Sequence, residues 1–247
     1  MKRKRKPQVG QEFMRKTQFK FLDPTGQAQG MMPPPIQLGH HPGAPVIGLP
    51  DPSKIEVTAV DLKAAIEARK SVRDFLEGSL TLEQVAFLLW CTQGVKEVEQ
   101  IETFRTVPSA GARHPFETYL VVNHVEDLEP GLYRYIALQH HLLPVNLEDG
   151  MGDRIAETCL QPDLIQTSAL TFIWTAVALR TTWRYGDRGY RYIHLDAGHV
   201  GQNLYLAAQA VECGVCTSAA FNDDELNRVL GIDGTQHFAV YFGSVGK

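Results

Sequence analysis

Apolar positions first recur with a helical period between Val57 and Arg69. Farther along, Thr81-Leu-Glu-Gln84 has the form of a capping box, and Gly94 follows the apolar run that this box opens. Helices begin at such boxes and commonly end at glycine. The pattern therefore predicts two helices, one over 57–69 and one between Thr81 and Gly94.

Short apolar runs in the middle of the chain predict strands. Tyr119–Val122 is one such run, and Gly131–Ile136 and Leu142–Val145 form two more that are joined around Gln139–His141. The longest apolar run, Ala169–Leu179, is well short of the roughly 18 residues that a membrane helix needs. It therefore predicts a buried strand, and we expect no membrane partner.

The remaining segments complete an irregular alternation of helices and strands. We expect a helix near Met151–Cys159, a polar loop over Thr181–Gly189, a long central helix over Tyr192–Glu212, an acidic-capped helix over Asp223–Leu230 and a last strand over His237–Phe242. This order favours an α+β fold, with a mixed sheet flanked by helices, over a strict strand-helix repeat.

Proline is concentrated at the N-terminus. Nine of the 14 prolines lie in the first 52 residues, including Pro33-Pro34-Pro35, and proline-rich segments are extended rather than helical. We expect an extended or partly disordered arm over 1–55 and one domain over 56–247. The arm is a tail, an SH3-type ligand, or a strap along its own domain or a dimer partner. The basic run Met1–Lys6 predicts a solvated tail, with a phosphate-binding arm as the alternative.

Composition narrows the expected partners and the compartment. The 247 residues carry a net charge of -4, with 44% hydrophobic and 21% charged residues, as in soluble globular proteins. This charge gives no attraction toward nucleic acid or anionic membranes. Four cysteines without an export signal indicate reduced thiols in the cytoplasm. Cys213 and Cys216 have the spacing of a redox or metal pair, but they lack a second pair, so we interpret them as structural.

Several catalytic motifs are incomplete or absent. Gly243-Ser-Val-Gly-Lys247 has the outline of a phosphate loop but lacks the following hydroxyl residue and helix. No GxGxxG follows a strand, and no GxSxG is present. His194 and His199 are five positions apart, which places them poorly on one helix face. These observations disfavour nucleotide triphosphatases, Rossmann dehydrogenases and hydrolases, and we expect no metal site.

Two segments carry candidate chemistry. Residues 69–73, Arg-Lys-Ser-Val-Arg, place three cations and a hydroxyl in five positions, which suits a phosphate, although a basic helix end would look the same. We call them the basic segment. The loop Pro108–Pro115 consists largely of small residues ahead of a strand. Small residues let backbone amides approach a flat ring, although a tight structural turn would also use them. We call it the small-residue loop.

Together these segments resemble the nitroreductase family, which pairs an Arg-x-Ser-x-Arg/Lys motif at a helix end with a Pro-Ser-rich loop before a strand. Four segments, one of which overlaps the small-residue loop, are similar to the SagB-type dehydrogenases, a branch that includes the thiazole- and oxazole-forming peptide oxidases. These segments are Leu88–Gly94, Val107–Arg113, Gly131–Tyr135 and Asp196–Leu204.

The resemblance implies a homodimer with FMN at the subunit interface. By position, Arg69 and Ser71 would bind the phosphate and ribityl chain, Lys70 would assist, and Arg73 would lie near the N1 and O2 edge of the flavin. A cation at that edge stabilises the negative charge that reduction creates. The residues expected to line or border the flavin are Pro108, Ser109, Ala110, Gly111, Ala112, Ala219 and Ala220.

The sequence departs from the family pattern at two cofactor positions. Ala112 stands where many members have asparagine, so backbone groups must replace that side-chain bond. The chain ends at Lys247, where members often have further cations, and Lys247 is the expected phosphate ligand there.

The expected catalytic residues are Arg184 and Tyr185, which match a Lys-Tyr pair of the azoline oxidases. Arginine is a poor general base, so this substitution lowers the expectation of azoline oxidation and keeps Tyr185 as an acid or base. The alternative is a structural cluster of stacked arginine and aromatic side chains.

The resemblance implies an FMN-dependent oxidoreductase that moves a hydride through flavin N5 in a ping-pong cycle. The substrate would be a small molecule or a peptide, with NAD(P)H as an expected donor. The alternatives are a flavin-binding partner or docking protein that has lost turnover, and a binder of phosphometabolites unrelated to the family.

Overall fold

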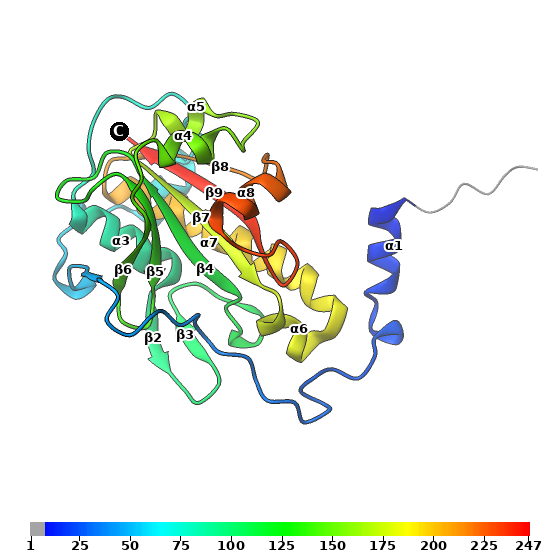
Figure 1. The fold of residues 1–247 in the computed structure, drawn as a ribbon. Helices are drawn as coiled ribbons and strands as arrows, with labels where there is room; N and C mark the ends of the chain where they lie inside the picture. The colour runs from blue at the N-terminus through cyan, green and yellow to red at the C-terminus, as the bar shows by residue number, and fades with distance from the viewer. Residues whose placement is uncertain (1–7) are drawn as a thin grey trace, which may run out of the picture.

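The structure is a computed structural model that describes residues 8–247, so the basic run Met1–Lys6 lies outside the described residues. A seven-stranded sheet forms the centre of the fold, in the order β1-β6-β5-β4-β7-β9-β8 (Figure 1). The strands of this sheet are β1 (Ile47–Gly48), β4 (Phe116–Val122), β5 (Gly131–Ile136), β6 (His141–Asn146), β7 (Leu170–Val177), β8 (Gly214–Ser218) and β9 (His237–Gly246). A separate hairpin pairs β2 (Val95–Val98) with β3 (Thr103–Arg105).

All strand pairs of the large sheet are antiparallel, which corrects the expectation of a mixed sheet. Residues 123–130 join β4 to β5 and residues 137–140 join β5 to β6, and connections without a crossover helix produce antiparallel neighbours. Parallel pairing occurs in two isolated bridges, Ser71–Val215 and Leu80–Val125. The α+β class itself is confirmed.

Helices cover both faces of this sheet (Figure 1). The helices are α1 (Val9–Lys16), α2 (Leu62–Ala68), α3 (Leu82–Gln93), α4 (Met151–Ala156), α5 (Asp163–Gln166), α6 (Leu179–Tyr185), α7 (Gly189–Ala210) and α8 (Asp223–Leu230). The predicted capping box is present, because the Thr81 and Gln84 side chains each accept from the other's backbone N–H at the start of α3. The long central helix is confirmed as α7.

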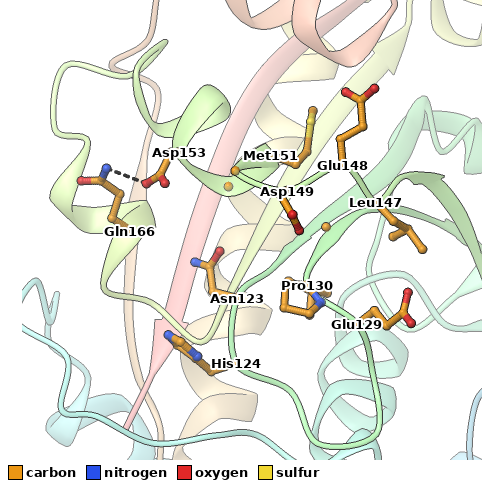
Figure 2. A pocket seen from close by; sticks show the side chains of 14 residues that line it. Asn123, His124, Glu129, Pro130, Leu147, Glu148, Asp149, Met151, Asp153 and Gln166 are labelled. Atoms are coloured by element: carbon orange, nitrogen blue, oxygen red, sulfur yellow. Dashed lines mark hydrogen bonds between the residues drawn. The ribbon is translucent and has the colours of Figure 1, made fainter.

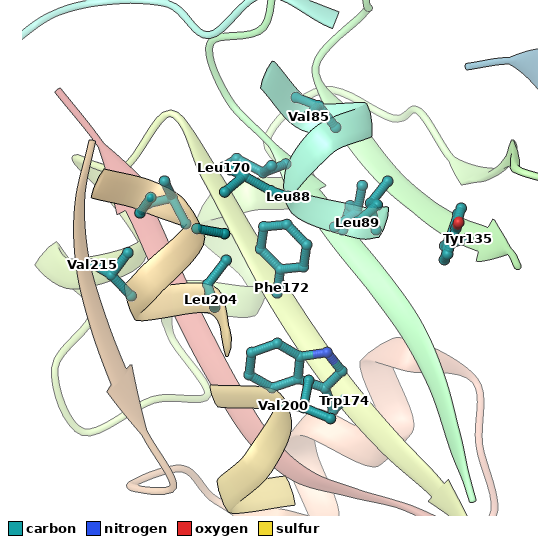
Figure 3. Close-up of a cluster of buried hydrophobic side chains, with 14 of the residues drawn as sticks. Val85, Leu88, Leu89, Tyr135, Leu170, Phe172, Trp174, Val200, Leu204 and Val215 are labelled. Atoms are coloured by element: carbon teal, nitrogen blue, oxygen red, sulfur yellow. The ribbon is translucent and has the colours of Figure 1, made fainter. Parts of the chain in front are cut away.

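Helices α3 and α7 pack on one face of the sheet and form the main core (Figure 3). Phe172 and Trp174 of β7 point toward these helices, and Leu204 of α7 and Leu88 of α3 are fully buried there. Burying each such side chain contributes roughly 1.5–3 kcal/mol. A second core lies under α4 and α8, so β4 and β7 bury apolar side chains on both faces of the sheet.

The expected polar loop over 181–189 is wrong. Helix α6 ends at Tyr185, and the short 3-10 helix Gly186–Arg188 leads directly into α7. Thr181 and Trp183 are buried, and the Trp183 indole donates to the carbonyl of Met31. Burial against distant parts of the chain therefore stabilises a helix that the polar sequence does not predict.

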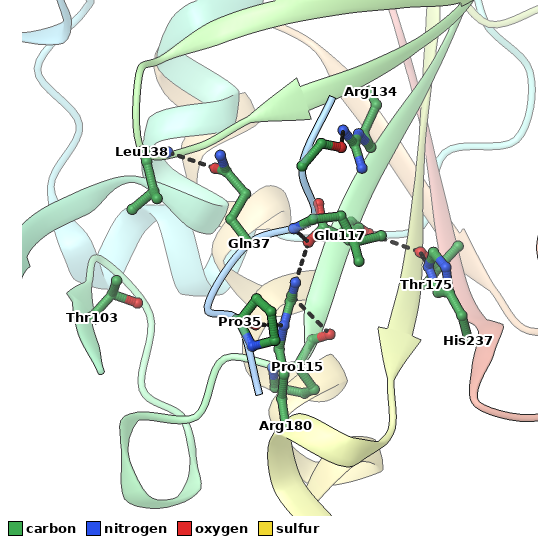
Figure 4. Close-up of polar contacts among 12 residues, drawn as sticks. Pro35, Gln37, Thr103, Pro115, Glu117, Arg134, Leu138, Thr175, Arg180 and His237 are labelled. Atoms are coloured by element: carbon green, nitrogen blue, oxygen red, sulfur yellow. Dashed lines mark hydrogen bonds and ion pairs between the residues drawn. The ribbon is translucent and has the colours of Figure 1, made fainter. Parts of the chain in front are cut away.

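The N-terminal arm crosses its own domain, one of the roles that the sequence left open. Arg180 donates to the carbonyl of Pro35, and Glu117 accepts from the backbone N–H of Leu38 (Figure 4). Arg180 and Glu117 form a buried ion pair beneath this strap, residues 31–39. The arm also contains α1, which corrects the expectation that it is non-helical throughout. Figure 1 shows α1 standing apart from the sheet.

Within residues 8–247, the structure contains no helix that is both long and apolar enough to cross a membrane. The four cysteines are free. Burial raises the pKa of the Cys213 and Cys216 thiols, which fits structural roles for this pair.

Candidate cofactor site

The basic segment lies beside the edge strand β8. Helix α2 ends at Ala68, Arg69 is its C-cap, and the chain then becomes extended. Ser71 pairs with Val215 through a parallel bridge, and the Val72 N–H donates to the Val215 carbonyl. Lys70, Ser71 and Arg73 are exposed, whereas Arg69 is half-buried. The segment therefore offers its charges and hydroxyl to solvent at a fixed position on the sheet edge.

Tyr205 of α7 contacts Ser71 and Arg69 of this segment, a role that the sequence did not reveal. Its hydroxyl lies 2.9 Å from Ser71 Oγ and accepts from the Thr217 N–H at 3.1 Å. The Arg69 guanidinium lies 5.2 Å from the centre of its ring, close enough for a cation–π contact. Because Thr217 donates to the phenol oxygen, the phenol proton is available to Ser71.

Ala219 and Ala220 follow β8 at its far end. Ala219 is exposed and Ala220 is half-buried. At the rise of a strand, Ala219 lies about 13 Å along the chain from Val215, the residue that pairs with Ser71. The basic segment and the two alanines thus border the same strand, and an elongated molecule can contact both.

Lys247 lies near the end of α7. Its Nζ donates to the Val211 carbonyl at 3.4 Å, and its own carbonyl accepts from the Leu76 N–H. Its aliphatic chain packs closely over Gly78. A phosphate role for Lys247 stays a prediction, and in this structure its amine interacts with the helix end.

Asp196 of α7 fixes the small-residue loop. Its carboxylate accepts from Ser109 Oγ at 2.5 Å and from the Ala110 N–H at 3.2 Å. Ser109 Oγ in turn accepts from the His114 N–H at 2.9 Å. Burial raises the pKa of Asp196, and the hydrogen bond from Ser109 opposes that shift. The Ser109 hydroxyl therefore uses its hydrogen bonds to hold the backbone of the loop.

The loop has an unusual backbone that these bonds support. Gly111, Ala112 and His114 have φ angles of 59°, 53° and 40°. This left-handed region suits glycine but strains residues with a Cβ. The Asp196 bonds therefore maintain a conformation that the alanine and histidine would not adopt on their own.

Asn203, about two turns after Asp196 on α7, holds the adjoining end of α3. Its Nδ2 donates to the Cys91 carbonyl at the end of α3 at 2.8 Å. Asp196 and Asn203 both lie in the segment Asp196–Leu204, one of those that carried the family resemblance. The family resemblance could have pointed to Asp196 and Asn203, but it assigned neither residue a role.

Arg184 and Tyr185 meet the small-residue loop at Gly111. Arg184 Nη1 donates to the Gly111 carbonyl at 3.4 Å and lies 3.9 Å from a carboxylate oxygen of Glu102. The Tyr185 hydroxyl occupies the space where a Cβ on residue 111 would stand. The two expected catalytic residues therefore adjoin the expected flavin loop.

A cavity of about 660 Å³ opens beside this loop. Its lining combines the loop, the β2–β3 hairpin and Arg184. The residues that line it include Lys96, Glu102, Phe104, Arg105, His114 and Arg184. A cavity of this size lies within the range of about 300–1,000 Å³ that is typical of small-molecule sites.

A separate cavity of about 530 Å³ lies between α4 and the β4–β5 turn (Figure 2). Its side chains include Glu129, Glu148, Asp149 and Asp153, and none of the predicted site residues lines it. Among residues 8–247, no group of three or more His, Cys, Asp or Glu side chains is arranged to hold a metal ion.

The two candidate segments lie at different levels of α7 in one subunit. Asp196 holds the small-residue loop, and Tyr205 holds the basic segment. These anchors are nine residues apart, which corresponds to about 13 Å along the helix axis. The structure places the basic segment beside the strand that leads to Ala219 and the loop beside Arg184.

An antiparallel sheet covered by a long central helix defines this molecule as an α+β protein. The sequence profile described as the Nitroreductase family matches residues 66–247. A relative from Methanocaldococcus jannaschii, named as a nitroreductase, is 37% identical over 186 residues, which cover 75% of this chain and 89% of the relative. The chain belongs to the nitroreductase family.

A second relative, the trifolitoxin-processing protein TfxB of Rhizobium leguminosarum bv. trifolii, is 26% identical over 74% of this chain and 52% of its own length. A nitroreductase structure from Anabaena variabilis has a TM-score of 0.64 and 30% identity, covering 76% of this chain and 38% of that chain. A Desulfovibrio desulfuricans nitroreductase in complex with FMN shares the fold, with a TM-score of 0.54 and 16% identity over 76% of this chain and 87% of that chain.

Proposed function

We propose that this protein is an FMN-dependent oxidoreductase of the SagB-type branch of its family. The observation that carries the proposal is the exposed basic segment, held by Tyr205 on the same strand that leads to Ala219 and Ala220. Family membership and the FMN complex of a structural neighbour support the choice of cofactor. FMN, when bound, supplies hydride transfer at its N5 position.

The residues of the basic segment fit a phosphate-bearing ligand. Arg69 and Ser71 would hold the phosphate and ribityl chain, with Lys70 assisting, since charge-assisted hydrogen bonds to phosphate are among the strongest in proteins. Arg73 would stabilise negative charge at the ring edge. Lys70, Ser71 and Arg73 are exposed, and Lys70 and Arg73 form no ion pair among the described residues. Their charges are therefore available to a ligand.

We propose a homodimer in which the small-residue loop of one subunit approaches the basic segment of its partner. Exposed apolar side chains near the basic segment support this arrangement, because Leu62 is 65%, Ile66 55% and Leu76 74% exposed, and a subunit interface would bury such residues. Light scattering on the flavin-loaded protein tests the dimer, and a stable monomer with full flavin content would contradict it.

Arg184 and Tyr185 would orient the substrate. Arg184 interacts with Glu102 and the Gly111 carbonyl, and a guanidinium does not lose its proton in the working range of an enzyme. Tyr185 keeps the role of acid or base because its hydroxyl reaches the loop at Gly111. A small molecule or a peptide would be the substrate, the latter supported by the processing role in the name of TfxB, and NAD(P)H would be the donor.

The test is the visible absorbance of the full chain after incubation with FMN and gel filtration, followed by anaerobic addition of NADH or NADPH. Retained flavin bands that bleach with a donor would support the proposal. Absence of flavin bands would contradict it. Flavin that stays oxidised with every donor and candidate substrate would instead indicate a binding partner without turnover.

Arg73→Ala tests the assignment within the basic segment. Loss of a charge-assisted contact should weaken FMN binding by roughly tenfold or more, or shift its reduction potential. Arg228→Ala, which removes an exposed arginine of α8, is the matched control and should change neither value. Equal affinities and potentials for Arg73→Ala and the wild type would contradict the role of Arg73.

A further inference from the structure

Arg105 is a buried arginine that forms no ion pair with a carboxylate among residues 8–247. It ends β3, is 6% exposed and lines the cavity beside the small-residue loop. Its Nε donates to Thr103 Oγ1 at 3.2 Å and its Nη1 donates to Gln93 Oε1 at 2.8 Å. Within the described part of the chain, Nη2 donates no hydrogen bond and the guanidinium forms no ion pair. Both of its acceptors are neutral.

The other charges around the cavity do not neutralise Arg105. Lys96 and Arg184 add two cations to the lining, and the carboxylate of Glu102 lies 3.9 Å from Arg184. Burial, followed by the charge of Arg105, lowers the pKa of His114 to about 3, so His114 is neutral at pH 7. Burial, followed by the charge of Arg180, lowers the pKa of Arg105 to about 10, so Arg105 keeps its charge.

A buried charge is costly unless it is paired. A guanidinium with a free Nη2 at a cavity wall therefore favours a ligand that supplies the missing anion. Guanidinium groups recognise carboxylate and phosphate oxygens in particular, because their planar donors match two oxygens at once.

We propose that the cavity is an anion subsite in which Arg105 receives a carboxylate or phosphate oxygen of the molecule that reacts at the cofactor. This inference rests on the proposed function and assigns a chemical class to its substrate. Phe104, which is 40% exposed on the neighbouring position of β3, adds an apolar wall. The subsite therefore suits an organic anion with a ring or an aliphatic body.

The first experiment compares benzoate with benzamide, which has the same shape without the charge. Calorimetric titrations use the wild-type full chain, both FMN-loaded and FMN-free. Benzoate should bind roughly tenfold or more tightly than benzamide, because one charge-assisted contact is gained. Equal binding, or no binding of either probe, would overturn the proposal without any variant.

The second experiment changes the cations of the cavity one at a time. Arg105→Gln should abolish the preference for benzoate, and Arg105→Lys should leave a weaker preference because the charge remains without the planar donors. Lys96→Gln is the matched control and should retain the preference, since Lys96 is an exposed cation of the lining and an exposed charge interacts only weakly with an ion. A preference that survives Arg105→Gln, or that disappears in Lys96→Gln alone, would overturn the proposal.

Flavin content separates this inference from the proposed function. If FMN binds but blocks benzoate, the cofactor itself fills the subsite and the inference fails. If benzoate preference appears in a protein that takes up no FMN, the anion subsite stands and the proposed function fails. Competition with NADPH identifies the source of the oxyanion: displacement of benzoate points to the nucleotide phosphates, and simultaneous binding points to a substrate carboxylate. Both results support the subsite.

Discussion

The basic segment and the small-residue loop, which we assign to one cofactor, differ in exposure, although side chains of α7 hold both. Lys70, Ser71 and Arg73 are exposed, and pairing with Val215 and a hydrogen bond between Ser71 and Tyr205 fix the segment on the sheet edge. In the loop, Arg113 and His114 are buried, and the carboxylate of a distant helix fixes the backbone. The basic segment presents charged side chains to a ligand, whereas the loop presents a fixed backbone conformation.

Because of this difference, substitutions in the two regions should affect ligand affinity and folding stability to different extents. A change in the basic segment removes exposed groups, and such substitutions usually alter unfolding by less than about 0.5 kcal/mol. A change around the loop leaves buried donors without acceptors, which costs more. We therefore expect ligand binding to respond to both regions but unfolding to respond mainly to the loop.

Asp196→Ala should give the largest effect on stability. It removes the acceptor of both Ser109 Oγ and the Ala110 N–H, so the free energy of unfolding should fall by about 2–4 kcal/mol. Urea denaturation of the variant and the wild type measures this difference in the free energy of unfolding. Asp187→Ala, at an exposed carboxylate before α7, is the control and should stay within about 0.5 kcal/mol of the wild type. A similar small value for Asp196→Ala would mean that the loop holds its shape without this brace.

Gly111→Ala should rank second. A Cβ at a φ of 59° would strain the backbone and overlap the Tyr185 hydroxyl. The expected loss of stability is about 2–3 kcal/mol, from left-handed strain and overpacking together.

Gly150→Ala separates the two causes of that loss. Gly150 has a φ of 75° but open space around it, so this variant should show the backbone cost of about 1 kcal/mol alone. Equal losses for the two variants in thermal denaturation would show that contact with Tyr185 has no energetic weight.

His114 makes the loop sensitive to acid. Burial lowers its pKa from 6.5 to about 3, so as the pH falls the unfolded chain takes up a proton before the folded protein does. The stability contribution is full above about pH 6.5 and is lost as the pH falls toward about 3, at up to roughly 1.4 kcal/mol per pH unit.

His114→Asn should flatten that pH dependence between pH 6 and pH 4. Asparagine accepts the left-handed backbone of residue 114. His194→Asn, at an exposed histidine of α7, is the control and should keep the wild-type slope. Unfolding free energies measured across this pH range would contradict the role of His114 if the two variants had the same slope.

The same contrast explains how far the sequence could predict the molecule. Helix α8 and strand β5 have the predicted bounds, because an acidic cap and an apolar run are local signals. Helix α6 was missed because distant parts of the chain bury Thr181 and Trp183. The basic segment could be recognised from its charges alone. The Ser109–Asp196 bond joins residues 87 positions apart, and no local pattern reports such a contact.

The smallest effect should come from Tyr205→Phe, on the side of the basic segment. The change keeps the ring beneath Arg69 but removes the hydroxyl that accepts from the Thr217 N–H and contacts Ser71. We expect a loss of about 1 kcal/mol in unfolding and a several-fold weaker FMN affinity. The affinity should fall because Ser71 loses the partner that orients it toward a phosphate.

Thr235→Val is the control for loss of a hydroxyl, because it removes an exposed hydrogen bond to Asp233 far from the basic segment. It should leave FMN affinity unchanged. If Tyr205→Phe lowers stability but binds FMN as the wild type does, Tyr205 supports only the fold. In that case the basic segment reaches its ligand through charge alone, because the orientation of Ser71 then makes no difference to binding.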